Sequence, residues 1–180
     1  MTQEPTAVRW LTPAENDAWV ALADVVFRLP AALDSDLQRE TNLSFYEYMV
    51  LAMLSEQPDR TLGMGVLAAL TSGSLSRLSH VVKRLEQAGY VTRSRSHHDK
   101  RHTNAQLTDS GWDKIRSSAP SHVTKVRETV FDALTAEQVA QLFEIANAIR
   151  GSLDSSRLPT PCEGLPAGAN PALTSNQAAL

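Results

Sequence analysis

The chain of 180 residues lacks several features that mark particular classes of protein. It has a single cysteine, Cys162, so no disulfide can form within the chain, which fits a reducing cytoplasm. It has neither a basic-then-apolar start nor an apolar run of about eighteen residues, so we expect neither export nor a membrane span. Glycine-rich phosphate loops, nucleophile elbows and paired His/Cys spacings are missing as well. The sequence therefore predicts a cytoplasmic protein that is not an enzyme and needs no cofactor.

Charge is distributed unevenly along the chain. The net charge of −3 would by itself argue against a nucleic-acid-binding protein. Residues 70–105, however, hold seven lysines and arginines against two acidic residues, whereas the rest of the chain holds ten against eighteen. A solvated surface helix and turn is the plainer explanation of such a strip. A strongly basic strip in an otherwise acidic protein nevertheless favours nucleic-acid binding.

The pattern within this basic strip predicts a helix followed by a hairpin. Apolar residues recur at spacings of three and four: Leu78, Val81, Val82 and Leu85. Gly89 is the left-handed residue expected to end this helix. Beyond it, residues 90–96 and 102–107 are expected to pair as two strands, with residues 97–101 as the connecting tip.

The segments on either side complete a helix-turn-helix order. A long helix is expected over residues 13–40, because Thr12, Pro13 and Glu15 form a typical helix start. A second helix follows Ser44, and a short helix is expected over residues 61–70 before the glycine-bearing turn into the basic helix. Two further helices are expected, one over residues 109–134 and one after a capping box at Thr135, with prolines 30 and 120 bending the helices that contain them. The fold class is therefore mainly α with a small β-hairpin wing, a winged helix-turn-helix domain plus a helical dimerisation region.

This pattern divides the chain into five parts. We expect a flexible N-terminus at 1–12, a dimerisation helix at 13–40, the winged helix-turn-helix domain at 41–108, C-terminal dimerisation helices at 109–153, and a disordered tail at 154–180. The apolar stripes of the dimerisation helices exceed what a small winged domain can cover. A homodimer is thus expected.

A helix of this kind fits the major groove of duplex DNA, and a basic hairpin can reach the adjacent minor groove. Early residues on the polar face should meet base edges, while Lys83 and Arg84, further along, should meet phosphates. The candidate DNA-binding residues are Ser74, Ser76, Arg77, His80, Lys83, Arg84, Arg95, Lys100 and Arg101.

Four parts of the sequence match the pattern of a known protein family. They are residues 81–91, Arg93, the wing-tip residues 99–101, and residues 107–111, which read Leu-Thr-Asp-Ser-Gly. With the helix order, they resemble the MarR family of bacterial transcriptional regulators over residues 13–153. The resemblance implies a triangular homodimer on a palindromic operator, with repression relieved by a small ligand or by oxidation. It also implies that Arg101 is the wing-tip arginine that enters the minor groove, with Asp99 and Arg93 supporting the wing.

The resemblance further implies an effector pocket between the dimerisation helices and the winged domain. The candidate lining residues are Trp19, Tyr46, Met49 and Trp112, which suit an aromatic small molecule, although each is more often a core residue than a pocket residue. Arg28 and Arg39 could neutralise an anionic ligand, or they could be ordinary surface groups. A metal site at His97, His98, Asp99 and His102 and a redox role for Cys162 are the less favoured alternatives within the family, and we interpret these residues as solvated histidines and an inert thiol. The remaining alternative is a degenerate winged helix that binds protein instead of DNA.

Overall fold

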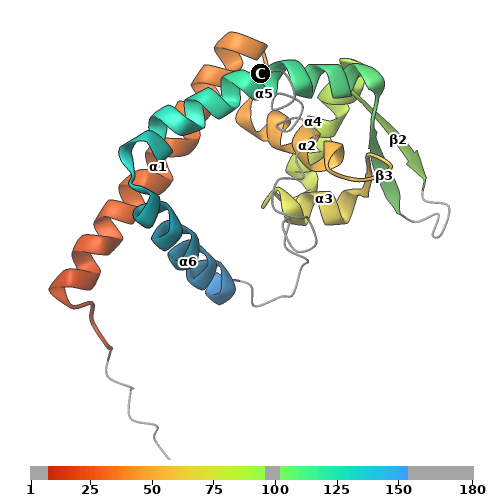
Figure 1. Ribbon diagram of the computed structural model, residues 1–180. Helices are drawn as coiled ribbons and strands as arrows, with labels where there is room; N and C mark the ends of the chain where they lie inside the picture. The colour runs from red at the N-terminus through yellow and green to blue at the C-terminus, as the bar shows by residue number, and fades with distance from the viewer. Residues whose placement is uncertain (1–7, 96–101, 154–180) are drawn as a thin grey trace, which may run out of the picture.

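The computed structural model describes residues 8–95 and 102–153 (Figure 1). The elements in chain order are α1 (Pro13–Thr41), α2 (Phe45–Ser55), β1 (Thr61–Gly63), α3 (Met64–Leu70), α4 (Leu75–Gln87), β2 (Val91–Arg95), β3 (Thr103–Leu107), α5 (Asp109–Thr129), a short 3-10 turn (Phe131–Ala133) and α6 (Ala136–Leu153). Figure 1 shows α1 and α5 side by side as a long arm, with the winged helix near the start of α5 and α6 leading away from its end, while α1 continues beyond that point. Among the described residues, no helix is long and apolar enough to cross a membrane.

Helix starts follow the predicted capping boxes. The Thr12 backbone N–H donates to Glu15 Oε2 at 2.7 Å, and the same reciprocal pattern joins Ser44 to Glu47. The backbone N–H of Thr135 donates to Gln138 Oε1 at 2.9 Å before α6. Each box satisfies backbone donors that a helix start leaves free, so local sequence alone determines where these three helices begin.

Two predicted helices were wrong in extent. Residues 61–70 do not form one helix, because Thr61–Gly63 pairs with β3 as strand β1, with Leu62 opposite Ala105. The helix predicted over residues 109–134 ends at Thr129, where Val130 leaves the helical region with φ −125°. Two adjacent β-branched residues favour such a break.

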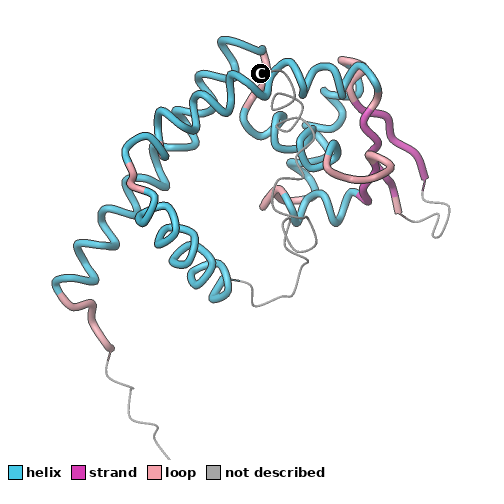
Figure 2. Tube along the Cα trace, viewed as in Figure 1, coloured by secondary structure: helices cyan, strands magenta, loops and turns pink. Residues whose placement is uncertain are grey.

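The wing is part of a three-stranded antiparallel sheet, drawn in magenta in Figure 2, with the strand order β1-β3-β2. The predicted pairing of the hairpin strands is confirmed, with Val91 opposite Leu107 and Arg95 opposite Thr103. The predicted fold class, mainly helical with a small β wing, is confirmed as well.

One hydrophobic core holds the winged helix together and extends beyond it. Its fully buried members from α2, α3 and α4 include Leu51, Leu54, Leu67, Leu78, Val82 and Leu85. Leu37 of α1 and Ile115 of α5, each 1% exposed, belong to the same cluster. The second half of α1 and the first half of α5 therefore share the core of the winged helix.

The junction between the wing and α5 explains the Leu-Thr-Asp-Ser-Gly sequence at 107–111. The Thr108 hydroxyl accepts from the Gly111 N–H at 3.0 Å and donates to the Gly89 carbonyl at 2.7 Å. A Cβ on Gly111 would lie 2.1 Å from the carbonyl oxygen of Tyr90. Only a glycine at 111 lets α5 start this close to the backbone of Tyr90, which follows α4, the recognition helix of the helix-turn-helix pattern.

Outside this core, α1 and α6 carry large apolar side chains that are exposed to solvent. Trp19 and Phe27 on α1 are 59% and 79% exposed, and Phe143 on α6 is 71% exposed. No residue of α6 is buried in the single chain. Exposed apolar side chains of this kind are typical of a surface that packs against another protein surface.

Candidate nucleic-acid interface

Helix α4 presents the predicted polar face. Its apolar stripe is buried in the core, and Ser74 caps its start by accepting from the backbone N–H of Arg77 at 3.2 Å. The exposed side chains on the opposite face are Ser76, Arg77, His80, Lys83 and Arg84. The structure thus places five of the nine candidate DNA-binding residues on one helix and a sixth, Ser74, at its N-cap.

Arg77 does not extend freely into solvent. Its guanidinium carbon lies 4.4 Å from the centroid of the Tyr46 ring, which is the distance of a cation–π contact. The Tyr46 hydroxyl lies 3.0 Å from Thr71 Oγ1 in the helix-turn-helix turn. A tyrosine near the start of α2 therefore supports the early part of the recognition helix.

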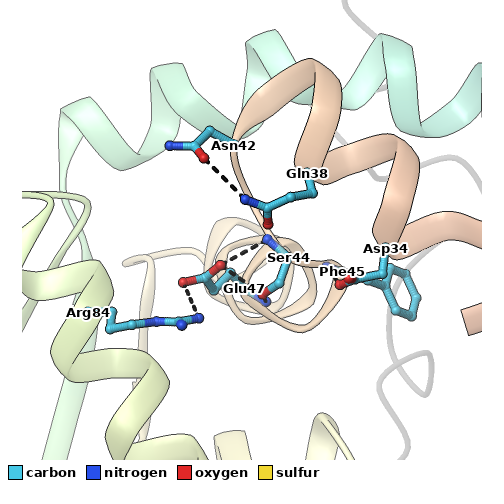
Figure 3. Close-up of polar contacts among 7 residues, drawn as sticks. All are labelled: Asp34, Gln38, Asn42, Ser44, Phe45, Glu47 and Arg84. Carbon is cyan, nitrogen blue, oxygen red and sulfur yellow. Dashed lines mark hydrogen bonds and ion pairs between the residues drawn. The ribbon is translucent and has the colours of Figure 1, made fainter. Parts of the chain in front are cut away.

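Arg84 is also held by α2. Its Nη2 lies 2.7 Å from Glu47 Oε1, while Glu47 Oε2 accepts from the backbone N–H of Ser44 (Figure 3). The Glu47 carboxylate is mostly buried and the Arg84 side chain is 62% exposed. The phosphate contact predicted for Arg84 thus has a competitor inside the chain.

The first turn of α2 is in turn fixed to the arm. The carboxylate of Asp34 on α1 accepts from the backbone N–H of Phe45 at 2.7 Å, as Figure 3 shows. In the same view, the Gln38 amide donates to Oδ1 of Asn42, the left-handed C-cap residue of α1, at 3.1 Å. Polar contacts therefore run from α1 through the first turn of α2 to the recognition helix.

Arg93 ties the wing to the recognition helix. Its Nε lies 2.9 Å from Glu86 Oε2 on α4, and this hydrogen bond lowers the pKa of the Glu86 carboxyl below its usual value. Arg95, at the end of β2, is exposed. Asp99, Lys100 and Arg101 lie outside the described residues, so the predicted wing-tip contacts stay predictions.

The fold and sequence have clear relatives. The chain is similar to Sco3205 of Streptomyces coelicolor, a MarR family transcriptional regulator crystallised in complex with DNA, with 39% identity and a TM-score of 0.79 over 85% of this chain and 99% of that one. This chain belongs to the MarR family. AbsC, a MarR family regulator from the same organism, is 37% identical with a TM-score of 0.72, covering 80% of this chain and 99% of that one. The family model for the transcriptional regulator SarA/Rot matches residues 32–117. The regulator MhqR of Bacillus subtilis is 31% identical over 106 residues, 57% of this chain and 69% of MhqR.

The family resemblance drawn from the sequence is therefore confirmed, and the protein is a transcriptional regulator, not an enzyme.

The residues predicted to line an effector pocket have different surroundings in the described part of the chain, although Tyr46, Met49 and Trp112 all pack against the same hydrophobic core. Trp19 is exposed on α1, and Met49 packs half-buried against the core. Tyr46 contacts Thr71 and Arg77, while the ring of Trp112 lies 4.5 Å below the guanidinium of Arg60. The pocket stays a prediction, and these contacts give three of the four residues a role in packing.

One site near these residues was missed from the sequence. His122 of α5 lies with its ring centroid 4.3 Å from that of Tyr48 and 5.9 Å from that of Phe45. Its Nδ1 is buried with no hydrogen-bond partner, and burial lowers the pKa of the imidazole below its ordinary value. The histidine follows Pro120 in a polar stretch, so nothing in the local pattern marked it as partly buried.

A groove lies on the side of the winged helix between α3, α4 and the sheet. Its volume is about 730 Å³, and its lining includes Met64, Val66, Leu75, Ser79, Arg93 and His102. Of these residues, Arg93 was predicted to support the wing and His102 belonged to the less favoured metal site, whereas the others had no predicted role in a site.

Proposed function

We propose that this regulator binds duplex DNA sequence-specifically as a homodimer on a palindromic operator, represses transcription there, and is released by a small-molecule effector in the cytoplasm. The observation that carries the proposal is the exposed face of α4, where Ser76, Arg77 and His80 project from a helix anchored by its apolar stripe. This face carries base-reading side-chain types in a chain whose other parts are net acidic.

Within this proposal the side chains of α4 divide by position. Arg77, Ser76 and His80 lie on the first half of the helix and meet base edges in the major groove. Lys83 lies further along and meets phosphate, where Arg84 joins it once DNA competes with Glu47 for the guanidinium. Arg95, Lys100 and Arg101 of the wing approach the neighbouring minor groove, with Asp99 and Arg93 supporting them.

The dimer is supported by the arm. The exposed side chains of Trp19, Phe27 and Phe143 would each gain roughly 1.5–3 kcal/mol on full burial. Residues 13–40 and 109–153 then form the dimer interface, and residues 41–108 present one winged helix each. Two such helices bind half-sites about one turn, or ~34–36 Å, apart. A stable monomer in light scattering at low micromolar concentration would contradict this assembly.

The effector remains a proposal from the sequence. The aromatic surface of Trp19 and Trp112, with Tyr46 and Met49 on α2, suits an aromatic molecule bound between the arm and the winged helix, and Arg28 and Arg39 on α1 could neutralise an anionic one. Two relatives in fold, each below 20% identity, are regulated by or bind such molecules: BpsR of Bordetella bronchiseptica with 6-hydroxynicotinic acid, and RdhR with 2,4-dichlorophenol.

A mobility-shift titration tests the function. The wild-type protein, Arg77→Ala and Arg28→Ala are titrated against the DNA upstream of the protein's own gene and against scrambled DNA, at several salt concentrations. Arg77→Ala should lose about 1–3 kcal/mol on the specific DNA and much less on scrambled DNA. Arg28→Ala is the matched control, because Arg28 is an exposed arginine on α1 paired with Asp24, away from α4.

The outcomes separate the alternatives. Equal losses of Arg77→Ala on both DNAs would make Arg77 a phosphate clamp. A wild-type protein that binds neither DNA would favour the protein-interaction module instead. For the wing, Arg101→Ala should weaken binding most on sites with flanking A/T runs, because narrow minor grooves attract arginine.

A further inference from the structure

Tyr46 contacts three parts of the helix-turn-helix unit at once. Its ring lies under the Arg77 guanidinium at 4.4 Å, and its hydroxyl lies 3.0 Å from Thr71 Oγ1. A Cβ on Gly73 would lie 2.0 Å from the Tyr46 hydroxyl oxygen, so the glycine of the turn leaves the space that this hydroxyl fills. Tyr46 is half-buried and packs against the core on its other side.

The hydrogen bonds of the turn fix the direction of the Tyr46 hydroxyl. Thr71 Oγ1 lies 2.8 Å from the Leu67 carbonyl oxygen, which can only accept. The single hydroxyl proton of Thr71 is therefore used there, and Tyr46 donates its own proton to Thr71 Oγ1. The tyrosine ring is held by a donor–acceptor chain that ends on the backbone of α3.

A fixed ring below an exposed arginine limits where the guanidinium can go. An arginine side chain has many rotamers, and ordering it on DNA costs conformational entropy unless the free protein already favours one direction. We propose that Tyr46 is a positioning residue that sets the direction of Arg77 and thereby contributes to the base preference of the regulator. This inference rests on the proposed function, and it gives Tyr46 a role at the DNA interface.

The test compares two substitutions at one position. Duplexes are selected from a random library with the wild-type protein, and affinities are measured for the selected duplex and for a set with single base-pair changes. Tyr46→Phe keeps the ring face and should keep the wild-type preference. Tyr46→Leu removes the ring face and should relax preference about two- to five-fold at the base pair that Arg77→Ala relaxes. In the double variant, Tyr46→Leu should cause no further loss of base preference beyond that of Arg77→Ala, because both substitutions remove the same contact.

Tyr90→Leu is the matched control for lost packing. Tyr90 is also half-buried against the core, but its ring lies 5.9 Å from Lys114 of α5 and carries no cation of α4. Any loss of affinity caused by Tyr90→Leu should be equal for all duplexes. If Tyr46→Leu behaves like this control, or if Tyr46→Phe relaxes preference as much as Tyr46→Leu, Tyr46 only supports the fold and the proposal is overturned.

A measurement without DNA separates this inference from the proposed function. In nuclear magnetic resonance spectra of the free protein, the ring current of Tyr46 should shift the side-chain protons of Arg77 upfield, and Tyr46→Leu should abolish the shift while Tyr46→Phe preserves it. Unshifted Arg77 protons in the wild type would overturn the positioning contact. Shifted protons in a protein with no base preference would instead sink the proposed function, and with it the part of Tyr46 in reading DNA.

Discussion

Replacing Gly111 by alanine should destabilise the protein, although alanine is the better helix former. The added Cβ would lie 2.1 Å from the Tyr90 carbonyl oxygen and 2.7 Å from Leu107 Cδ1. The leucine methyl can rotate away, but the carbonyl is backbone and accepts from the Thr108 N–H at 3.0 Å. The start of α5 must therefore move away from the end of the recognition helix, which strains this hydrogen bond.

The contributions to the free energy of unfolding that Gly111→Ala lowers and raises can be compared. Inserting a methyl group into a packed site costs about 1–3 kcal/mol, and weakening one hydrogen bond costs about 1 kcal/mol. Alanine returns about 1 kcal/mol through its higher helix propensity. The free energy of unfolding should therefore fall by about 1–3 kcal/mol.

Chemical denaturation at one fixed protein concentration measures this change, because the stability of a homodimer depends on concentration. Gly65→Ala is the matched control: Gly65 lies in α3, and its Cβ would meet nothing within 4 Å. It should leave stability unchanged or raise it by up to about 1 kcal/mol. If Gly111→Ala is as stable as Gly65→Ala, the close approach of α5 to Tyr90 is not as tight as described.

Two other perturbations address the contacts of α2 and α5. Burial lowers the pKa of His122 below its ordinary 6.5, so the unfolded chain binds a proton that the folded chain resists, and wild-type stability should fall as the pH drops below 6.5. His122→Phe should reduce this slope in denaturation measured between neutral and mildly acidic pH, and an unchanged slope would exclude His122 as its source. Glu47→Gln should lower the free energy of unfolding by about 1 kcal/mol, because the amide keeps the cap on Ser44 but loses the ion pair with Arg84. An equal loss in an Arg84→Ala background would show that the ion pair contributes nothing.

Local patterns in the sequence predicted the parts of the fold that depend on near neighbours. The capping boxes at Thr12, Ser44 and Thr135 and the buried stripe of α4 all involve residues within a turn or two of one another. Strand β1 was missed because Thr61–Gly63 becomes a strand only through pairing with β3, more than forty residues later. Its own residues, with a glycine at the end, favour neither a helix nor a strand strongly.

The same distinction applies to the candidate site. The positions of Ser76, Arg77 and His80 on the exposed face of α4 follow from helical periodicity alone. The partners of Arg77 and Arg84 could not be predicted, because Tyr46 and Glu47 reach them from another helix, and Glu47 lies 37 residues before Arg84. A charged residue on an exposed helix face says nothing by itself about the partner that three-dimensional packing gives it.

The core that joins Leu37 and Ile115 to the winged helix limits how this regulator can be re-engineered. A chimera that exchanged residues 41–108 as a cassette would leave those two side chains facing a foreign core, and it would separate Asp34 from the backbone of Phe45. Each mismatch of this kind in a packed interior destabilises a protein by about 1–3 kcal/mol. New operator preferences are better introduced by exchanging only the exposed side chains of α4, because these can change without disturbing the packing that α1 and α5 share with the DNA-binding end.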